Sequence, residues 1–176
     1  MGRLTLNPIK HIDPIGLLMM MLFKFGWAKP VPVNMHSFER PKWYMALTAI
    51  AGPISNIILA IIVLFILGLV ETALGGPPQG GEGYTMYDII FRTAYLSTAL
   101  AVFNLMPIPP LDGSKVLFSF FSDRTYFKLM KYERFGIILL IIVLNTDFFG
   151  KTIGQLTLTL FTKLSIFMEA AYKLVN

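Results

Sequence analysis

The sequence predicts an all-α polytopic membrane protein with three to four transmembrane helices and a short membrane-associated β segment near the N-terminus. Hydrophobic residues make up 55% of the 176 residues, and the mean hydropathy of +0.66 is too high for an ordinary water-soluble domain. The fifteen Lys and Arg residues flank apolar runs instead of gathering in one basic patch. We therefore expect the lipid bilayer as a partner and no nucleic acid.

The first 42 residues are expected to lie beside the membrane. The stretch "GRLTLNP" (residues 2–8) alternates apolar and polar side chains with the two-residue period of a half-buried strand, which Pro8 ends. An edge strand there could bind an extended substrate peptide by backbone pairing, and a purely structural hairpin arm is the alternative. Residues 15–23, "IGLLMMMLF", are too few to span and suit a re-entrant or interfacial segment.

Two segments have the length and composition of spanning helices within a single membrane domain, residues 1–176. Residues 43–70 hold no charge over 28 positions, more than the roughly 20 that a membrane helix needs. Residues 89–111 are the second candidate, and the Gly- and Pro-rich stretch between the two predicts an exposed loop. Residues 135–170 contain two shorter apolar segments, interrupted by Asp147 and Lys163, which predict a membrane hairpin.

The distribution of charge orients these segments. Residues 1–42 hold six Lys or Arg and residues 112–134 hold five, whereas residues 71–91 hold none and carry three acids. By the positive-inside rule the two basic regions are cytoplasmic. Asp112, which follows the second spanning candidate, is therefore expected near the cytoplasmic side of the membrane.

The stretch "FNLMPIPPLDGSK" (residues 103–115) combines a helix break with a carboxylate. Pro107, Pro109 and Pro110 exclude regular helix and predict extended backbone, which a membrane tolerates only where it is buried in protein or lines a wet cavity. Asp112 follows at once, and a charged carboxylate in the apolar region costs about 2.5 to 3.5 kcal/mol, so a cation, a metal or water should compensate it. A plain Asp-Gly turn with Ser114 as the N-cap of the next helix is the alternative.

Two further stretches bear on the site. "AGPISN" (residues 51–56) places Gly52 and Pro53 within the best spanning segment, and such small residues predict that another helix packs on this face. His11 and His36 are the only histidines, and their separation does not give the i, i+4 spacing of two zinc ligands on one helix. Both lie in polar, turn-like surroundings, so neither histidine is expected to be a metal ligand.

The stretches "GRLTLNPIKHIDPIG", "FGWAKPVPVN", "AGPISN" and "FNLMPIPPLDG" follow one another in an order that resembles the site-2 protease family of intramembrane zinc metalloproteases. The resemblance covers about residues 1–118 and is strongest to compact bacterial and archaeal members without a PDZ domain. It implies zinc as cofactor, transmembrane protein substrates and a place in a bacterial or archaeal cell membrane. It also implies roles for individual residues: Asp112 as the third zinc ligand, Asn104 as a catalytic group that binds the reacting carbonyl or its oxyanion, Thr5, Leu6 and Asn7 as substrate-binding residues, and Pro107, Pro109 and Pro110 as residues that line the site.

The chain departs from the family in one respect. The family carries H-E-x-x-H, two zinc ligands and the general base, on a helix before the "GRLTLNP" stretch, and the 176 residues contain no H-E-x-x-H. We expect that the sequence is truncated at its N-terminus and that this chain alone does not hydrolyse peptides. A non-catalytic pseudoprotease that binds membrane segments is the first alternative, and a small transporter or channel subunit with Asp112 in an ion path is the second.

Overall fold

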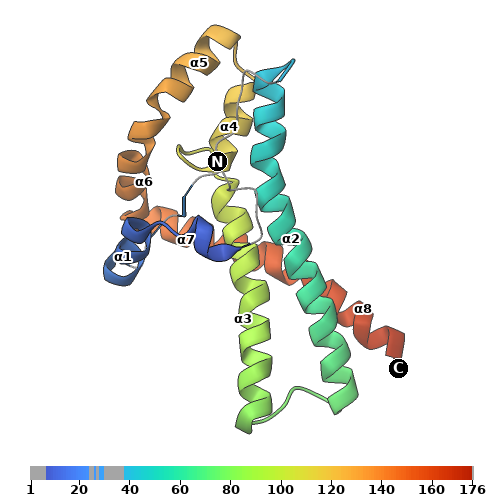
Figure 1. The fold of residues 1–176 in the computed structure, drawn as a ribbon. Helices are drawn as coiled ribbons and strands as arrows, with labels where there is room; N and C mark the ends of the chain where they lie inside the picture. Colours follow the sequence, from blue (N-terminus) through green and yellow to red (C-terminus); the bar gives the residue numbers. More distant parts are fainter. Residues whose placement is uncertain (1–6, 24–25, 27, 30–37, 176) are drawn as a thin grey trace. The chain divides into compact units, whose positions relative to one another are not determined.

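A computed structural model of the protein describes residues 7–23, 26, 28–29 and 38–175. The chain divides into two compact units, Met1–Glu39 and Arg40–Asn176. The regular elements in the described residues are all helical, which confirms the all-α part of the predicted fold (Figure 1). The predicted β segment stays a prediction, because Thr5 and Leu6 lie outside the described residues.

The first unit contains a 3-10 helix, η1 (Pro8–His11), and a ten-residue helix, α1 (Pro14–Phe23). Asn7 caps η1, since its side-chain oxygen accepts the Ile9 N–H at 3.0 Å. An isolated antiparallel bridge pairs Ile12 with Ala28. Ten residues make a helix about 15 Å long, half the thickness of a bilayer core, so α1 is too short to cross, as its sequence predicts.

The second unit begins with α2 (Pro41–Leu74), a 34-residue helix that contains the predicted span 43–70 and continues through Pro53. Within the described residues it is the one unbroken helix that is long and apolar enough to cross a membrane. Gly75 ends it in the left-handed conformation (φ 72°), where glycine is favoured, and its N–H bonds to the Thr72 carbonyl at 3.1 Å.

The next helix, α3 (Gly81–Asn104), lies beside α2 and runs antiparallel to it (Figure 1). It starts eight residues before the predicted 89, so the predicted loop shrinks to residues 75–80. The first half of α3 holds the charged residues Glu82, Asp88 and Arg92. Arg92 Nε contacts Asp88 Oδ2 at 2.6 Å, one turn away. Because of these polar residues, α3 is less apolar than α2 and is not a candidate span on its own. The prediction of three to four spans is therefore not confirmed.

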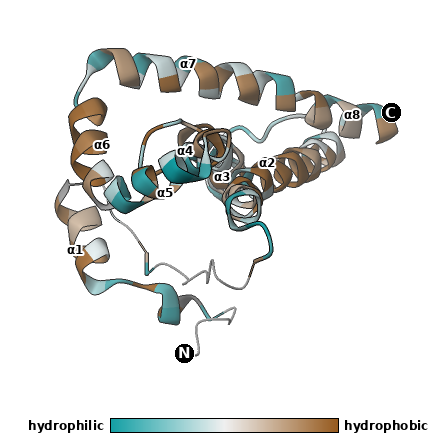
Figure 2. Ribbon diagram, turned by 90° about the horizontal axis from the view of Figure 1, so that it is seen from above, coloured by the Kyte–Doolittle hydropathy of each residue, from teal (hydrophilic) through white to brown (hydrophobic). Residues whose placement is uncertain are grey.

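The remaining helices follow a proline-rich loop, residues 105–111. They are α4 (Asp112–Ser119), α5 (Asp123–Tyr132), η3 (Glu133–Phe135), α6 (Gly136–Leu144), α7 (Asp147–Leu164) and α8 (Ile166–Val175). Figure 2 shows that α5 is largely hydrophilic and α6 strongly hydrophobic. The helix α6 meets the continuous pair α7 and α8 at a bend of 85°, so the C-terminal segments form a broken span or a re-entrant turn, in the region where a membrane hairpin was predicted.

The core of the second unit lies where α7 reaches α2 and α3. Phe161 of α7 is its centre, with ring centroids 5.3 Å from both Phe91 and Tyr95 of α3 in edge-to-face geometry. The buried members of the cluster come from all three helices: Ala60, Leu64, Ala94, Phe161 and Leu164. Most of α2 nevertheless stays uncovered, since only 22% of its most apolar window is buried, as expected for a lipid-facing helix.

A second close contact joins α2 to α8. Gly68 lies so near α8 that a Cβ atom in its place would overlap the Met168 carbonyl oxygen and lie 3.0 Å from the Ala171 Cβ. Helices approach this closely only where one of them presents a glycine. The small residue at position 68 therefore fixes where the C-terminal helix packs.

Candidate functional site

The carboxylate predicted as a ligand sits in the first turn of α4. Leu111 is the N-cap and Asp112 is the first helical residue. Ser114 lies inside the helix, and its hydroxyl donates to the Leu111 carbonyl at 2.7 Å. The alternative prediction that Ser114 is the N-cap is therefore wrong by three residues, and Asp112 gains the favourable position of an acid at a helix N-terminus.

Gly113 allows the first turn of α4 to pack closely on the preceding backbone. A Cβ atom at this position would overlap the carbonyl oxygen of Leu105 and lie 2.6 Å from that of Met106. The start of α4 thus packs directly on the backbone that follows α3. The Asp-Gly pair therefore begins α4 and packs closely on the preceding backbone, and the interpretation of it as an ordinary turn is wrong.

The proline-rich loop connects α3 to α4 by compact turns. The helix α3 ends at Asn104, so the predicted helix break is confirmed. The backbone is not the predicted extended strand, because the Ile108 N–H bonds to the Met106 carbonyl and the Leu111 N–H to the Ile108 carbonyl, both at 2.9 Å. The Pro109–Pro110 peptide bond is cis. These turns fold the loop back and bring α4 onto the end of α3.

The loop is supported from the other side by α6. A Cβ atom on Gly136, the first residue of α6, would lie 2.5 Å from the Pro109 Cβ and 2.6 Å from its carbonyl carbon. Glycine at position 136 is therefore required for this contact. The loop is held between α3 and α6, which fixes the position from which Asp112 projects.

A cation compensates the Asp112 carboxylate. Lys115 Nζ lies 3.5 Å from Asp112 Oδ1 and 3.5 Å from Glu133 Oε1. The three side chains are 33%, 21% and 22% exposed in the order Asp112, Lys115, Glu133. Sequence reasoning missed Lys115, although an opposite charge three residues along a helix is a recognisable signal. Glu133 has no such local signal, since its approach depends on how α5 turns into η3.

The second oxygen of Asp112 lies close to α2. The nearest atom to a Cβ built on Gly52 of α2 is Asp112 Oδ2, at 3.5 Å. The "AGPISN" face of α2 therefore carries another helix, as predicted, and that helix is α4. The absent side chain at position 52 lets the Asp112 carboxylate approach α2 closely.

The other predicted site residues are only partly assembled. Asn104 is the last residue of α3, and its amide donates to the Leu100 carbonyl at 2.9 Å. Asn104 and Asp112 thus stand at the two ends of the loop 105–111. Asn7 belongs to the first unit, where it caps η1, and its partners in the predicted strand, Thr5 and Leu6, lie outside the described residues.

The described residues do not by themselves make a zinc site. A catalytic zinc takes three protein ligands, and no group of three His, Cys, Asp or Glu side chains in the described part of the chain could hold a metal ion. Asp112 fits as one ligand, because its carboxylate is partly exposed at the start of α4. His11 lies in the first unit and His36 outside the described residues.

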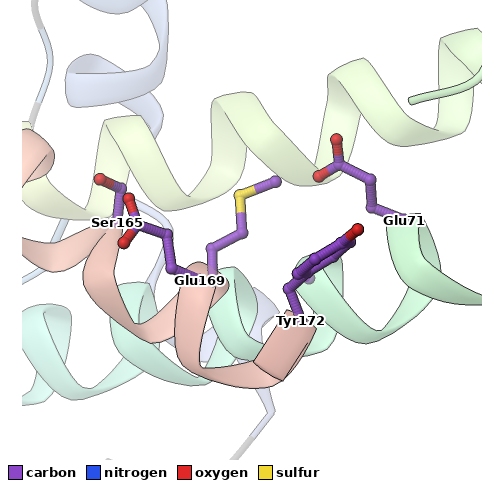
Figure 3. Close-up of a pocket in the computed structure, with 6 residues that line it drawn as sticks. Glu71, Ser165, Glu169 and Tyr172 are labelled. Atoms are coloured by element: carbon purple, nitrogen blue, oxygen red, sulfur yellow. The ribbon is translucent and has the colours of Figure 1, made fainter. Parts of the chain in front are cut away.

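A separate acidic pocket of about 250 Å³ lies between α2 and α8 (Figure 3). Figure 3 shows Glu71 on α2 and Glu169 on α8, with Tyr172 between them. The pocket begins at Gly68, 16 residues along α2 from Gly52, or about 24 Å at 1.5 Å per residue. It is therefore distinct from the Asp112 site, and two carboxylates fall short of a metal-binding set.

Comparison with known proteins bears directly on the proline-rich loop. A sequence model of peptidase family M50 matches residues 82–144, which run from α3 to the end of α6 and include Asn104 and Asp112. No solved structure matches the chain.

Three relatives of the chain carry the name of a putative zinc metalloprotease. "Putative zinc metalloprotease YwhC" of Bacillus subtilis is 39% identical over 146 residues, covering 82% of this chain and 66% of that protein. "Putative zinc metalloprotease Rip2" of Mycobacterium tuberculosis is 28% identical, covering 85% and 58%. "Putative zinc metalloprotease MJ0611" of Methanocaldococcus jannaschii is 31% identical, covering 58% and 49%. The chain spans about half to two thirds of the length of these relatives.

Proposed function

Because the chain belongs to peptidase family M50, the site-2 proteases, we propose that it is the C-terminal part of an intramembrane zinc metalloprotease. In this proposal the complete site hydrolyses peptide bonds of membrane-embedded substrates when a helix bearing H-E-x-x-H is present. The observation that carries the proposal is the position of Asp112, which lies partly exposed in the first turn of α4 with its Oδ2 against Gly52 of α2, within the segment that matches the family. Two imidazoles from the H-E-x-x-H helix would complete the ligand set.

The elements around Asp112 have distinct roles in this proposal. Zinc, when bound, would supply an activated water molecule and polarise the substrate carbonyl. Asp112 would hold the metal, and Asn104 would bind the reacting carbonyl from the end of α3. The loop with Pro107, Pro109 and Pro110 would line the site. The chain would lie in a bacterial cell membrane with Asp112 toward the cytoplasmic side, as the basic segment 112–134 favours.

The test supplies a helix that bears H-E-x-x-H. Such a helix is fused upstream of Met1, and zinc is measured by elemental analysis beside cleavage of a membrane-embedded reporter. We expect about one zinc per chain in the fusion, loss of zinc and cleavage in Asp112→Ala, and retention of both in Asp147→Ala. Asp147 is a control because it is likewise an acid in the first turn of a helix, α7. Unchanged zinc content in Asp112→Ala would refute the ligand assignment.

The alternative is a pseudoprotease that binds membrane segments without metal. The observation in its favour is the uncovered apolar face of α2, together with the absence of H-E-x-x-H from the 176 residues. Binding of a labelled transmembrane peptide by the 176-residue chain in the presence of a chelator would support this function. Cleavage of that peptide by the same chain after addition of zinc would exclude it.

A further inference from the structure

An apolar pocket of about 370 Å³ lies between the end of α3 and the last turns of α7. Five of its lining side chains are apolar, and the other two are Thr159 and Lys163. The complete lining is Val102, Leu105, Met106, Leu156, Thr159, Leu160 and Lys163. This volume lies within the range of pockets that bind small molecules, and apolar walls with one or two polar groups are typical of such pockets.

Lys163 is an isolated charge. It is the only charged residue between positions 152 and 168, in a stretch that runs from α7 into α8. No lining residue of the pocket is acidic, and Lys163 forms no ion pair with an acidic residue in the part of the chain that the structure describes. Lys163 is exposed, so its ammonium group is accessible to an anion from outside the chain. A lysine close to lipid normally pairs with an anionic group.

The pocket and the lysine together define an amphipathic site. The apolar walls are open on one side, with Leu156 47% exposed and Leu105 40% exposed, so a hydrocarbon chain could enter from the bilayer. The cation stands among these walls and would attract a negative group attached to that chain. Charge complementarity and apolarity thus select the same kind of occupant, a lipid with an anionic headgroup.

We propose that this pocket binds an anionic phospholipid, with an acyl chain between α3 and α7 and the phosphate at Lys163. The lipid would contact Leu105 and Met106, which begin the loop that leads to Asp112. It would also complete the packing of α7 on α3 beyond the Phe161 cluster. The proposal does not depend on zinc or on proteolysis, and it applies to the 176-residue chain.

The test is a lipid titration of the purified chain in detergent, followed by native mass spectrometry. The probes are phosphatidylglycerol and phosphatidylcholine with identical dioleoyl chains. We expect phosphatidylglycerol to bind more tightly and Lys163→Gln to weaken it about fivefold, the factor expected for one lysine at an anionic headgroup. Lys163→Arg, which keeps the charge, should stay within about twofold of the wild type. Lys151→Gln is the control, since Lys151 is exposed on α7 outside the pocket.

Two further measurements separate a lipid site from weaker alternatives. Leu156→Trp fills the apolar part of the pocket and keeps the lysine, and we expect it to weaken phosphatidylglycerol binding as well. Glycerol phosphate, which has the charge and no acyl chains, should not displace the lipid even in 100-fold excess. Equal binding by the wild type and Lys163→Gln, equal affinity for the two lipids, or displacement by glycerol phosphate would each overturn the proposal.

Discussion

Replacement of Gly113 by alanine tests the packing that positions Asp112. The added Cβ overlaps the Leu105 carbonyl oxygen and lies 2.6 Å from that of Met106. Both atoms belong to the backbone, so no side-chain rotation relieves the overlap and α4 must move away from the end of α3. Overpacking of this kind costs about 1 to 3 kcal/mol. The gain in helix propensity from Gly to Ala, at most about 1 kcal/mol, offsets only part of that cost.

The matched control is Gly154→Ala on α7, where a Cβ atom meets nothing within 4 Å. It isolates the propensity gain, so the difference between the two variants measures the overlap alone. A difference of about 2 kcal/mol corresponds to an apparent Tm about 4 to 8 °C lower for Gly113→Ala than for Gly154→Ala. Thermal unfolding in detergent, followed by circular dichroism, provides the measurement. Equal Tm values for the two variants would refute the close packing of α4 on the loop.

Three more variants test other contacts in the second unit. Gly68→Ala should lower the free energy of unfolding by about 1 to 3 kcal/mol, because its Cβ overlaps a backbone carbonyl of α8, whereas Gly83→Ala, with its nearest atom at 3.8 Å, should not. Phe161→Leu should lower the free energy of unfolding by about 1 to 3 kcal/mol, because two ring contacts are lost. Phe148 is 80% exposed, so Phe148→Leu should leave that free energy almost unchanged. Unfolding by denaturant compares the two variants. Burial raises the pKa of Tyr126 above 10, so the folded state holds its proton more tightly and stability falls as pH rises beyond 10. Tyr126→Phe should reduce this loss of stability at alkaline pH. Because the buried hydroxyl has no partner among the described residues, the variant should be as stable as the wild type or more so at neutral pH. Melting curves at pH 7 and about pH 10.5 report both effects.

The sequence predicts the helical elements better than their ends. The uncharged run at 43–70 identifies α2, and the prolines at 107, 109 and 110 identify the end of α3 at Asn104. The start of α3 was misplaced, because Gly81 and Gly83 have low helix propensity and the helix nevertheless extends through them. The loop before it is short because Gly75 caps α2 at once.

The residues of the candidate site were likewise predictable only in part. The motif around Asp112 could be recognised from its residue types and order, since prolines followed by Asp-Gly form a local pattern. The approach of Asp112 to Gly52 and the contact of Glu133 with Lys115 could not, because each depends on contacts between segments far apart in the chain. Gly113 was interpreted as a turn residue, since sequence alone does not show that the preceding backbone folds back over it.

The Lys115 contact bears on whether Asp112 is available as a ligand. The pair is 3.5 Å apart and both side chains are partly exposed, so the contact is worth at most about 1 kcal/mol. Structural zinc sites bind their metal with roughly ten times that free energy or more. The ion pair is therefore too weak to withhold the carboxylate. Because Glu133 also lies 3.5 Å from Lys115 Nζ, the lysine keeps an acidic partner when Asp112 turns toward Gly52. The contact with Lys115 thus leaves Asp112 free to exchange this partner for another, as the proposed ligand role requires.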